Sequence, residues 1–340
     1  MLNNKIIKNK LLICFISLIL LFVRYNNIYI TEEWTKSQLN PVLGNKTIGT
    51  VFDPFVISHD NSYKMYVSWR SKGAIALSTS KDGIHWSDLE IILNKGDSKS
   101  WESIVNRASI LLLDGKFFLY YTGQNLEKSE IGLAISENGY NFTRYKKNPI
   151  LKPEYEYEKQ SVMNPHVIYD KDEKIFKMWY SAGETVEPDV ICYALSKNGI
   201  KWIKYNNNPI FFSNPNKIYL DSYKVGGCDV HKISKKKYIM FYIGYSSLNS
   251  ARIFVAESEN GIYKWKRGNF PIIKPKANQF DSEACYKPSA IYDNKHKQWI
   301  IWYNGRTNDK EYIGIAYYNN YKLFKKINYI QWLKELFGIF

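Results

Sequence analysis

The 340-residue chain is 45% hydrophobic and 16% aromatic, so it can bury a large core, which excludes a disordered chain. Its 28 Tyr and 10 Trp, combined with few stretches of helical periodicity, favour an all-β fold. The formal net charge of +15 comes from Lys distributed along the sequence, without a basic helix or a nucleic-acid-binding motif, so nucleic acid is not an expected partner. Four Cys without a CxxC pair and five His without an HExxH pattern give no reason to expect a metal or another cofactor.

The N-terminus has the pattern of a targeting segment. Lys5, Lys8 and Lys10 precede an apolar run at residues 11–23, which is shorter than the roughly 20 residues of a full membrane span. No small-residue cleavage site follows the run, so residues 1–30 are interpreted either as an uncleaved signal anchor or as a cleaved signal peptide. The basic residues before the run predict that the rest of the chain lies on the extracytoplasmic side, anchored to the membrane or secreted.

A repeat of about 60 residues dominates the remaining sequence. Each repeat contains an aromatic strand, an Ala-x-Ser strand and a tight turn of Asp-Gly or Asn-Gly, in which both residues tolerate positive φ. The turns are Asp82-Gly83, Asn138-Gly139, Asn198-Gly199 and Asn260-Gly261. With an opening strand before these elements and an outer strand after them, the pattern predicts five four-stranded units, which is a five-bladed β-propeller over residues 31–320.

The outer strands carry an aromatic residue, basic residues and Asn-Pro, as between Trp202 and Asn208. The fifth unit lacks this element after residues 313–316. The same pattern occurs instead at the start of the domain, between Trp34 and Asn40. We therefore expect an N-terminal strand to complete the fifth blade and close the ring.

Residues 321–340 fall outside the repeat. They place apolar residues such as Leu323, Ile327 and Ile330 at helical spacing, with Lys325 and Lys326 among them. The segment is predicted to form a short amphipathic helix, which either lies on a membrane surface or packs against the propeller.

In a propeller the first strand of each blade lines the central channel, so the residues that open these strands converge although they are far apart in sequence. The openers are Asp53, Arg107, Asn164 with His166, Asp229 and Lys287, with Glu102, Asp281 and Glu283 just before their strands. A second ring is expected where the aromatic strands end, at Trp69, Arg70, Gln124, Glu184, Tyr245 and Asn304-Gly305-Arg306. Paired carboxylates suit glycoside hydrolysis, in which one protonates the leaving oxygen and the other activates water or attacks the sugar.

The succession of an aromatic strand, Ile-Gly-x-Ala-x-Ser and Asp-Gly-Ile-x-Trp resembles the five-bladed glycosidase superfamily of arabinanases, levansucrases and invertases over residues 31–318. Glycosidase families 43 and 32 and the related mannoside phosphorylases are the most similar. The resemblance implies a sugar-binding funnel in which Asp53, which precedes a proline, is base or nucleophile. Where these enzymes have a second Asp in blade three, this chain has Asn164. Where they have a general-acid Glu, it has Asp229, with Glu283 as a substitute in the next blade.

The leading hypothesis is a glycoside hydrolase-like enzyme that acts on a cell-surface or envelope glycan. Asp53 is assigned as base or nucleophile, and Asp229 or Glu283 as an acid whose pKa is raised by partial burial. The predicted substrate-binding residues are Glu102, Arg107, Asn164, His166, Lys287, Arg70, Trp69 and Arg306. Two alternatives stay open: a non-catalytic glycan-binding propeller, and a glycoside phosphorylase or transferase in which Arg107, Lys287 and Arg306 hold phosphate.

Overall fold

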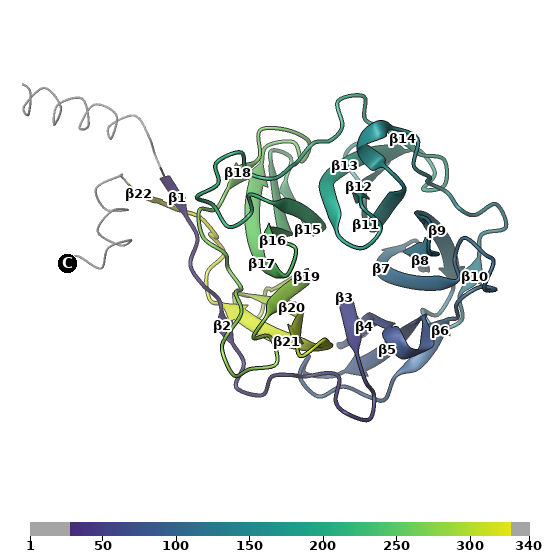
Figure 1. Cartoon of the computed structure of the whole chain (residues 1–340), viewed down its shortest axis with the longest axis horizontal. Helices are drawn as coiled ribbons and strands as arrows, with labels where there is room; N and C mark the ends of the chain where they lie inside the picture. The colour runs from purple at the N-terminus through teal and green to yellow at the C-terminus, as the bar shows by residue number, and fades with distance from the viewer. Residues whose placement is uncertain (1–27, 328–340) are drawn as a thin grey trace, which may run out of the picture.

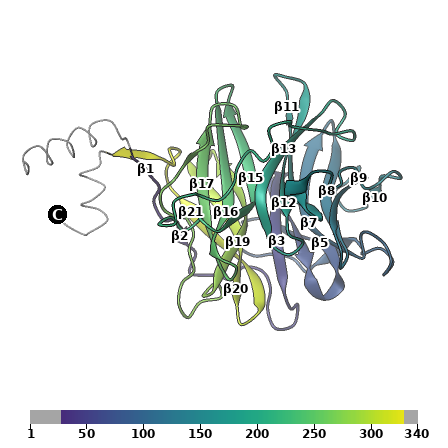
Figure 2. The same cartoon turned by 45° about the horizontal axis from the view of Figure 1, so that its top comes forward.

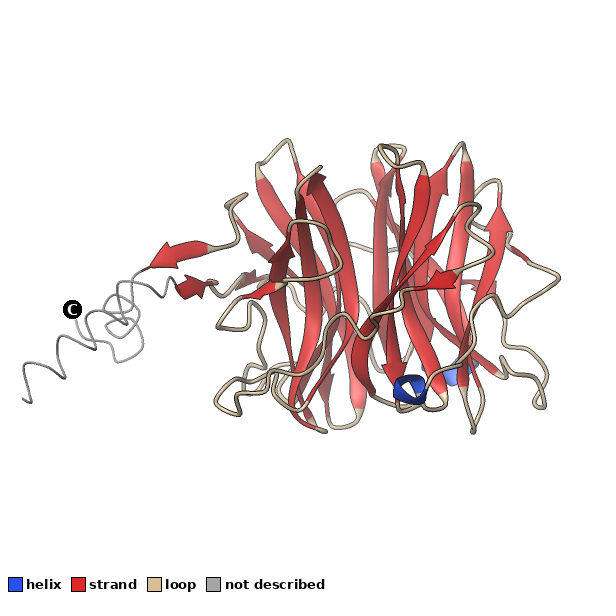
Figure 3. Ribbon diagram, turned by 90° about the horizontal axis from the view of Figure 1, so that it is seen from above, coloured by secondary structure: helices blue, strands red, loops and turns tan. Residues whose placement is uncertain are grey.

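The computed structural model describes residues 28–327, which form an all-β ring of five blades around a central channel (Figure 1). The turned views show that the strands of every blade run roughly along this channel (Figure 2, Figure 3). Blade 1 contains β3 (Val51–His59), β4 (Ser62–Trp69), β5 (Ala74–Ser80) and β6 (Glu90–Leu93). Blade 2 contains β7 (Ile104–Leu113), β8 (Lys116–Gln124), β9 (Ser129–Ser136) and β10 (Thr143–Arg144).

Blade 3 contains β11 (Ser161–Asp170), β12 (Ile175–Gly183), β13 (Pro188–Ser196) and β14 (Ile203–Lys204). Blade 4 contains β15 (Lys224–Ser234), β16 (Lys237–Ser247), β17 (Ser250–Ser258) and β18 (Lys266–Arg267). Blade 5 contains β19 (Ala284–Asp293), β20 (Gln298–Thr307), β21 (Lys310–Tyr318) and the N-terminal β2 (Thr35–Lys36). Two short 3-10 turns, η1 (Arg70–Lys72) and η2 (Glu156–Glu158), lie between strands.

The Asp-Gly and Asn-Gly turns connect neighbouring blades. In each turn the glycine carbonyl accepts a hydrogen bond from an aromatic side chain of the second strand of an adjacent blade. The pairs are Tyr66 with Gly139, Tyr120 with Gly199, Trp179 with Gly261 and Trp302 with Gly83. Apolar clusters fill the same blade-to-blade interfaces, as where Trp179 of blade 3 packs with Tyr238 of blade 4. The repeated turns and aromatic strands of the sequence therefore hold the ring together.

The N-terminal segment supplies the outer strand of blade 5, as the sequence predicts. Thr35 and Lys36 pair antiparallel with Tyr317 and Ala316 of β21. The side chain of Asn40 then mimics one more backbone pairing: its Oδ1 accepts from the Ile315 N–H at 2.8 Å and its Nδ2 donates to the Ile315 carbonyl at 3.0 Å. The Asn residues before proline in blades 2 and 3 bond their own third strands in the same way, which explains the Asn-Pro pattern.

A buried ion pair ties the outer strand to the sheet in four blades of the described chain. A carboxylate that precedes the first strand accepts from a Tyr hydroxyl of the second strand and pairs with a basic residue of the outer strand. The sets are Glu102 with Tyr121 and Arg144, Glu158 with Tyr180 and Lys204, Asp221 with Tyr242 and Arg267, and Asp281 with Tyr303 and Lys36. Glu102 thus belongs to the framework of blade 2, which corrects its predicted substrate-binding role.

Asp281→Ala is expected to lower the free energy of unfolding by about 3 kcal/mol, because it removes one partner of a buried ion pair and leaves the Lys36 ammonium and Tyr303 hydroxyl without this acceptor. Lys36 belongs to β2, so the N-terminal segment should also be cleaved faster by proteases. Urea unfolding and limited proteolysis measure the two effects. Glu33→Ala, which removes an exposed pair with Lys274, is the control and should cost under about 1 kcal/mol. Equal effects would contradict the prediction.

The two ends of the described chain pair with each other. β1 (Ile28–Ile30) runs antiparallel to β22 (Lys325–Ile327) beside blades 4 and 5 (Figure 1). The helix predicted over residues 321–340 is wrong for residues up to 327, because extended chain already buries Leu323 against the cluster that contains Trp34. Residues 328–340 and the predicted anchor or signal peptide at residues 1–27 lie outside the described residues. Within residues 28–327, none of the helices has the length and apolarity to cross a membrane.

Candidate functional site

The first strand of every blade carries a β-bulge at the same position near the channel mouth. The bulged residues have positive φ: Asp53 (51°), Arg107 (56°), Asn164 (51°), Gly227 (50°) and Lys287 (33°). Four of these described residues are not glycine, and each strained backbone of this kind costs about 1–3 kcal/mol. Such strain is typical of functional sites, so the ring of bulges marks the mouth as the candidate site.

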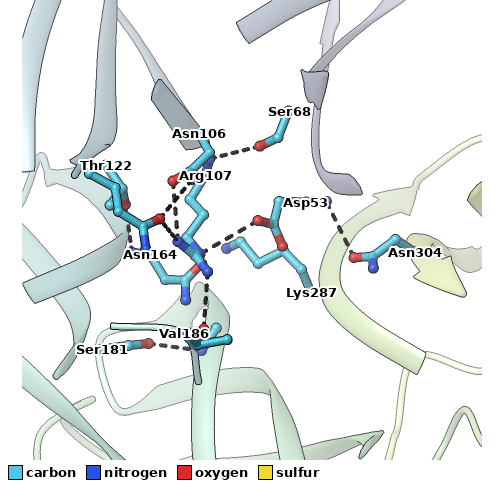
Figure 4. Close-up of polar contacts among 12 residues, drawn as sticks. Asp53, Ser68, Asn106, Arg107, Thr122, Asn164, Ser181, Val186, Lys287 and Asn304 are labelled. Atoms are coloured by element: carbon cyan, nitrogen blue, oxygen red, sulfur yellow. Dashed lines mark hydrogen bonds and ion pairs between the residues drawn. The ribbon is translucent and has the colours of Figure 1, made fainter. Parts of the chain in front are cut away.

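Each bulge except that of blade 5 is held by a side chain of an adjacent blade (Figure 4). The backbone N–H of the bulged residue donates to an oxygen near the end of the neighbouring second strand. The pairs are Arg107 with Ser68 at 2.9 Å, Asn164 with Thr122 at 3.0 Å, Gly227 with Ser181 at 2.9 Å and Asp53 with Asn304 at 3.3 Å. The same hydrogen bonds therefore join adjacent blades and fix the orientation of the bulged residues.

A cavity of about 400 Å³ opens at this mouth, within the size range of small-molecule sites. The predicted residues Asp53, Arg107 and Asn164 line it. Second strands and the loops after them add Trp69, Arg70, Gln124, Glu187, Tyr245 and Asn304, while β19 and β21 of blade 5 add Tyr286 and Glu311. The predicted convergence of the opening residues is therefore found for three blades of the described chain, whereas the predicted openers of blades 4 and 5, Asp229 and Lys287, do not line the cavity.

Asp53 lies among cations. Its Oδ2 is 3.6 Å from Arg107 Nε, and Lys287 reaches toward the same carboxylate (Figure 4). Burial raises the pKa of Asp53 above its ordinary value, while the positive charges of Arg107, Lys287 and Arg70 oppose that rise. The Lys287 ammonium is fully buried and donates to the Cys228 carbonyl at 3.1 Å. The net effect is a raised pKa for the Asp53 carboxyl, with the neighbouring cations limiting the rise.

Three buried polar atoms at the cavity lack a hydrogen-bond partner within residues 28–327: Asp53 Oδ2, Asn164 Oδ1 and the Tyr286 hydroxyl. Buried polar groups in folded proteins are almost always paired. These atoms are therefore candidate contacts for a polar ligand, and sugar hydroxyls can both donate and accept.

A carboxylate that the sequence analysis did not select, Glu187, enters the cavity from the loop between β12 and β13. The Tyr245 hydroxyl donates to Glu187 Oε2 at 2.5 Å. Burial raises the pKa of Glu187; Tyr245 and Arg107 oppose the rise, and the charge of Asp53 increases it. The loop itself is fixed, because Arg107 donates to the Val186 carbonyl and Gln124 to that of Thr185.

A second additional carboxylate, Glu311, comes from β21 of blade 5. Its Oε2 accepts from Arg70 Nη2 at 3.0 Å, and the Arg70 guanidinium lies 4.4 Å from the centre of the Phe52 ring. Burial raises the pKa of Glu311, Arg70 lowers it, and the charge of Asp53 raises it. Arg70 and Trp69 were predicted at this mouth, and both line the cavity.

Asp229 does not occupy the position that the sequence analysis gave it. The bulge of blade 4 is formed by Gly227, and Asp229 lies two residues further along β15, outside the cavity lining. Its Oδ2 accepts from the Ala290 N–H at 2.6 Å and lies 3.2 Å from His231 Nε2. Burial would raise the pKa of Asp229, but His231, His166 and the Ala290 N–H together lower it to about 2. The predicted acid with a raised pKa is therefore wrong at this residue.

His166 belongs to the same deeper layer of the channel. Its Nδ1 lies 3.3 Å from Asp229 Oδ1, and its Nε2 is 2.9 Å from the Val230 carbonyl. Burial lowers the pKa of His166 to about 4, so the ring is neutral at pH 7. His166 thus joins adjacent blades below the cavity, and its predicted contact with substrate is corrected.

Glu283 and Arg306 pair with each other on the rim. Arg306 Nε donates to Glu283 Oε2 at 3.1 Å, and the Asn308 N–H donates to Glu283 Oε1 at 2.8 Å. Neither residue lines the cavity. The pair stabilises the β20–β21 hairpin, which removes the structural basis for Glu283 as an acid and for Arg306 as a substrate contact.

Residues 28–327 contain no cluster of His, Cys, Asp and Glu that could hold a metal ion. The polar groups of the cavity are instead carboxylates, guanidinium groups, amides and phenols. Such a set can transfer protons, bind hydroxyls and stabilise charge. The ring of blades is a propeller, and the set at its mouth includes the carboxyl groups that the glycosidase class uses.

Comparisons with known proteins agree with this class. Residues 76–218 match the model of the glycosyl hydrolases family 32 N-terminal domain. A thermostable family-43 glycoside hydrolase has a TM-score of 0.67 at 17% identity, covering 86% of this chain and 95% of that chain. A structure from the GH130 family of mannoside phosphorylases has a TM-score of 0.68 at 17% identity, with 86% and 95% covered. The chain therefore has the five-bladed propeller fold of the glycosidase superfamily that its sequence resembles.

Among curated proteins, the chain is similar to an uncharacterized protein of Mycobacterium tuberculosis strain H37Rv. The two are 28% identical over 228 residues, which are 64% of this chain and 72% of that protein. A glycosyl hydrolase structure from Bacteroides ovatus has a TM-score of 0.68 at 16% identity, covering 88% of this chain and 96% of that chain.

Proposed function

We propose that the chain is a glycoside hydrolase that cleaves a cell-surface or envelope glycan in the cavity at the channel mouth. The observation that carries the proposal is that Asp53, Glu187 and Glu311 meet at one cavity, each with a pKa raised by burial. Carboxyl groups held in different environments supply the acid and the base that glycoside hydrolysis needs. The targeting pattern of residues 1–30 favours a substrate outside the cytoplasm.

The surroundings of the carboxyl groups assign their roles. Three cations, Arg107, Lys287 and Arg70, favour the ionised form of Asp53, and we therefore assign Asp53 as the base or nucleophile. At Glu187, only the Tyr245 phenol and one guanidinium, that of Arg107, oppose the effect of burial on the pKa. The nearby negative charge of Asp53 favours the protonated form of Glu187. Glu187 is therefore the general acid that protonates the leaving oxygen. Glu311 is committed to Arg70 and helps to orient the sugar.

A panel of oligosaccharides and alkyl and aryl glycosides, incubated with the full chain with and without inorganic phosphate, tests the proposal. Phosphate-independent release of a reducing sugar is the expected result, and NMR of the first product gives its anomeric configuration. A sugar 1-phosphate would indicate a phosphorylase, for which Arg107 and Lys287 supply cations beside the cavity. Saturable binding without any product would indicate a non-catalytic glycan-binding propeller.

Gln124→Ala is expected to reduce kcat about 10- to 100-fold, because Gln124 fixes the loop that carries the general acid and a displacement of about 1 Å is costly. Its Nε2 donates to the Thr185 carbonyl, and its Oε1 accepts from Arg107 at 3.2 Å. The pH profile of kcat/KM distinguishes a positioning role from a general loss of fold, because the alkaline limb should move while the thermal unfolding temperature stays close to wild type. An unchanged pH profile and kcat would contradict the role.

A further inference from the structure

We propose that the wall of the cavity beside Glu187 binds an aliphatic leaving group, so that the substrate is a glycoside whose sugar is attached to a hydrocarbon chain. The inference rests on the proposed function and specifies its substrate class. It starts from three apolar side chains that line one side of the cavity and are exposed to solvent: Ile104 (44%), Leu126 (102%) and Val186 (69%).

These three side chains come from adjacent blades. Ile104 begins β7, Leu126 lies in the β8–β9 hairpin of the same blade 2, and Val186 lies in the β12–β13 loop of blade 3. Single exposed apolar residues are common on protein surfaces and need no explanation. Three of them on one wall of a cavity form a hydrocarbon surface whose burial would be favourable.

The backbone holds this surface in place. Asn125 Oδ1 accepts from the N–H groups of Glu127 and Lys128, both at 2.9 Å, which fixes the hairpin around Leu126. The carbonyl of Val186 accepts from Arg107, which fixes the second loop. A ligand would therefore meet a prearranged wall and would lose little loop entropy on binding.

The exposed aliphatic side chains of the described lining all come from blades 2 and 3. Blades 1 and 5 contribute Arg70, Glu311 and Asn304, which can hydrogen-bond to sugar hydroxyls. Blades 2 and 3 contribute Ile104, Leu126 and Val186 alongside polar residues such as Gln124, and Val186 directly precedes Glu187 in the sequence. The general acid protonates the oxygen of the leaving group, so the leaving group lies on the Glu187 side. Ile, Leu and Val side chains offer a second sugar no hydrogen bonds, whereas they suit a hydrocarbon chain.

Octyl and methyl glycosides of the same common hexoses and pentoses test the inference with the full chain. For the sugar whose glycosides are cleaved, we expect kcat/KM to be at least about tenfold higher for the octyl glycoside than for the methyl glycoside. A factor of about ten is typical of discrimination between apolar groups in a pocket. Leu126→Ser and Val186→Ser should each lower this octyl-to-methyl ratio about threefold or more. Ile203→Ser is the matched control, because Ile203 is 76% exposed on β14 and does not line the cavity.

Binding is measured in parallel by calorimetry with the same glycosides. Equal kcat/KM and equal affinity for octyl and methyl glycosides would overturn the inference, as would a ratio that Leu126→Ser and Val186→Ser leave unchanged. If none of the glycosides is cleaved but octyl glycosides bind in a Leu126-dependent manner, the apolar wall is supported and the proposed hydrolase function fails. Absence of both cleavage and preferential binding overturns the two together.

Discussion

Asp53→Asn is expected to lower kcat/KM about 100- to 10,000-fold for every substrate that the chain cleaves, because it removes the base or nucleophile while keeping the shape of the side chain. The backbone of Asp53 has a φ of 51°, a conformation that Asn adopts as readily as Asp. The chain itself provides the precedent, since Asn164 occupies the equivalent bulge of blade 3 with the same φ. The variant should therefore fold, and steady-state kinetics measure the loss.

Asp60→Asn is the matched control for this prediction. Asp60 has a φ of 50°, but its side chain is 81% exposed in the β3–β4 turn of the same blade, so the same chemical change occurs away from the cavity. We expect wild-type kinetics for this control. A folded Asp53→Asn variant that retains more than about a third of wild-type kcat/KM would remove Asp53 from the mechanism, given that loss of a general base costs at least about 100-fold.

The architecture of the ring could be predicted because its determinants are local and repeated. Each Asn-Gly or Asp-Gly turn is recognisable in isolation, and each sits at the same place relative to an aromatic strand. The missing outer strand of the fifth unit could be assigned by the same logic. Asn40 makes in blade 5 the hydrogen bonds that Asn148 makes in blade 2. In both blades the Asn before proline therefore joins the outer segment to the third strand.

The C-terminal segment shows where periodicity misleads. Leu323 and Phe324 fit a helical spacing, yet both pack against the apolar cluster between blades 4 and 5 while the chain is extended and then pairs with β1. A short apolar segment satisfies either conformation, and the decision depends on the surface that it meets. That surface is built from Trp34, Trp299 and their neighbours, which are distant in sequence.

The site was predictable in position but not in its complete set of residues. In blade 4 the bulged position is occupied by Gly227, so aligning the blades by polar residue type selected Asp229, two residues further along the strand. Of the second ring, Trp69, Arg70, Gln124 and Tyr245 line the cavity, but Arg306 does not. Glu184, which pairs with Lys159 outside the lining, was chosen rather than Glu187 three positions later. The pKa values of the cavity carboxyls depend on charges contributed by other blades, and these emerge only when the ring is assembled.

Glu187→Gln is expected to lower kcat/KM about 100- to 10,000-fold for alkyl glycosides, which leave poorly without protonation, and far less for nitrophenyl glycosides, which leave readily as anions. The wild-type pH profile should be bell-shaped. Activity falls with rising pH as Glu187 loses its proton, at a pH above the ordinary value of 4.5 because its pKa is raised. Activity falls with decreasing pH as Asp53 becomes protonated, above its ordinary value of 3.8.

In the Glu187→Gln variant the alkaline limb should disappear, because the amide has no proton to lose, while the acidic limb due to Asp53 should persist. Glu184→Gln serves as the control: its carboxylate is 49% exposed and pairs with Lys159, so both limbs should remain. An alkaline limb that survives in Glu187→Gln, or an equal loss for alkyl and nitrophenyl glycosides, would show that another group donates the proton. Of the described cavity carboxyls, Glu311 would then be the one to test, because burial raises its pKa as well.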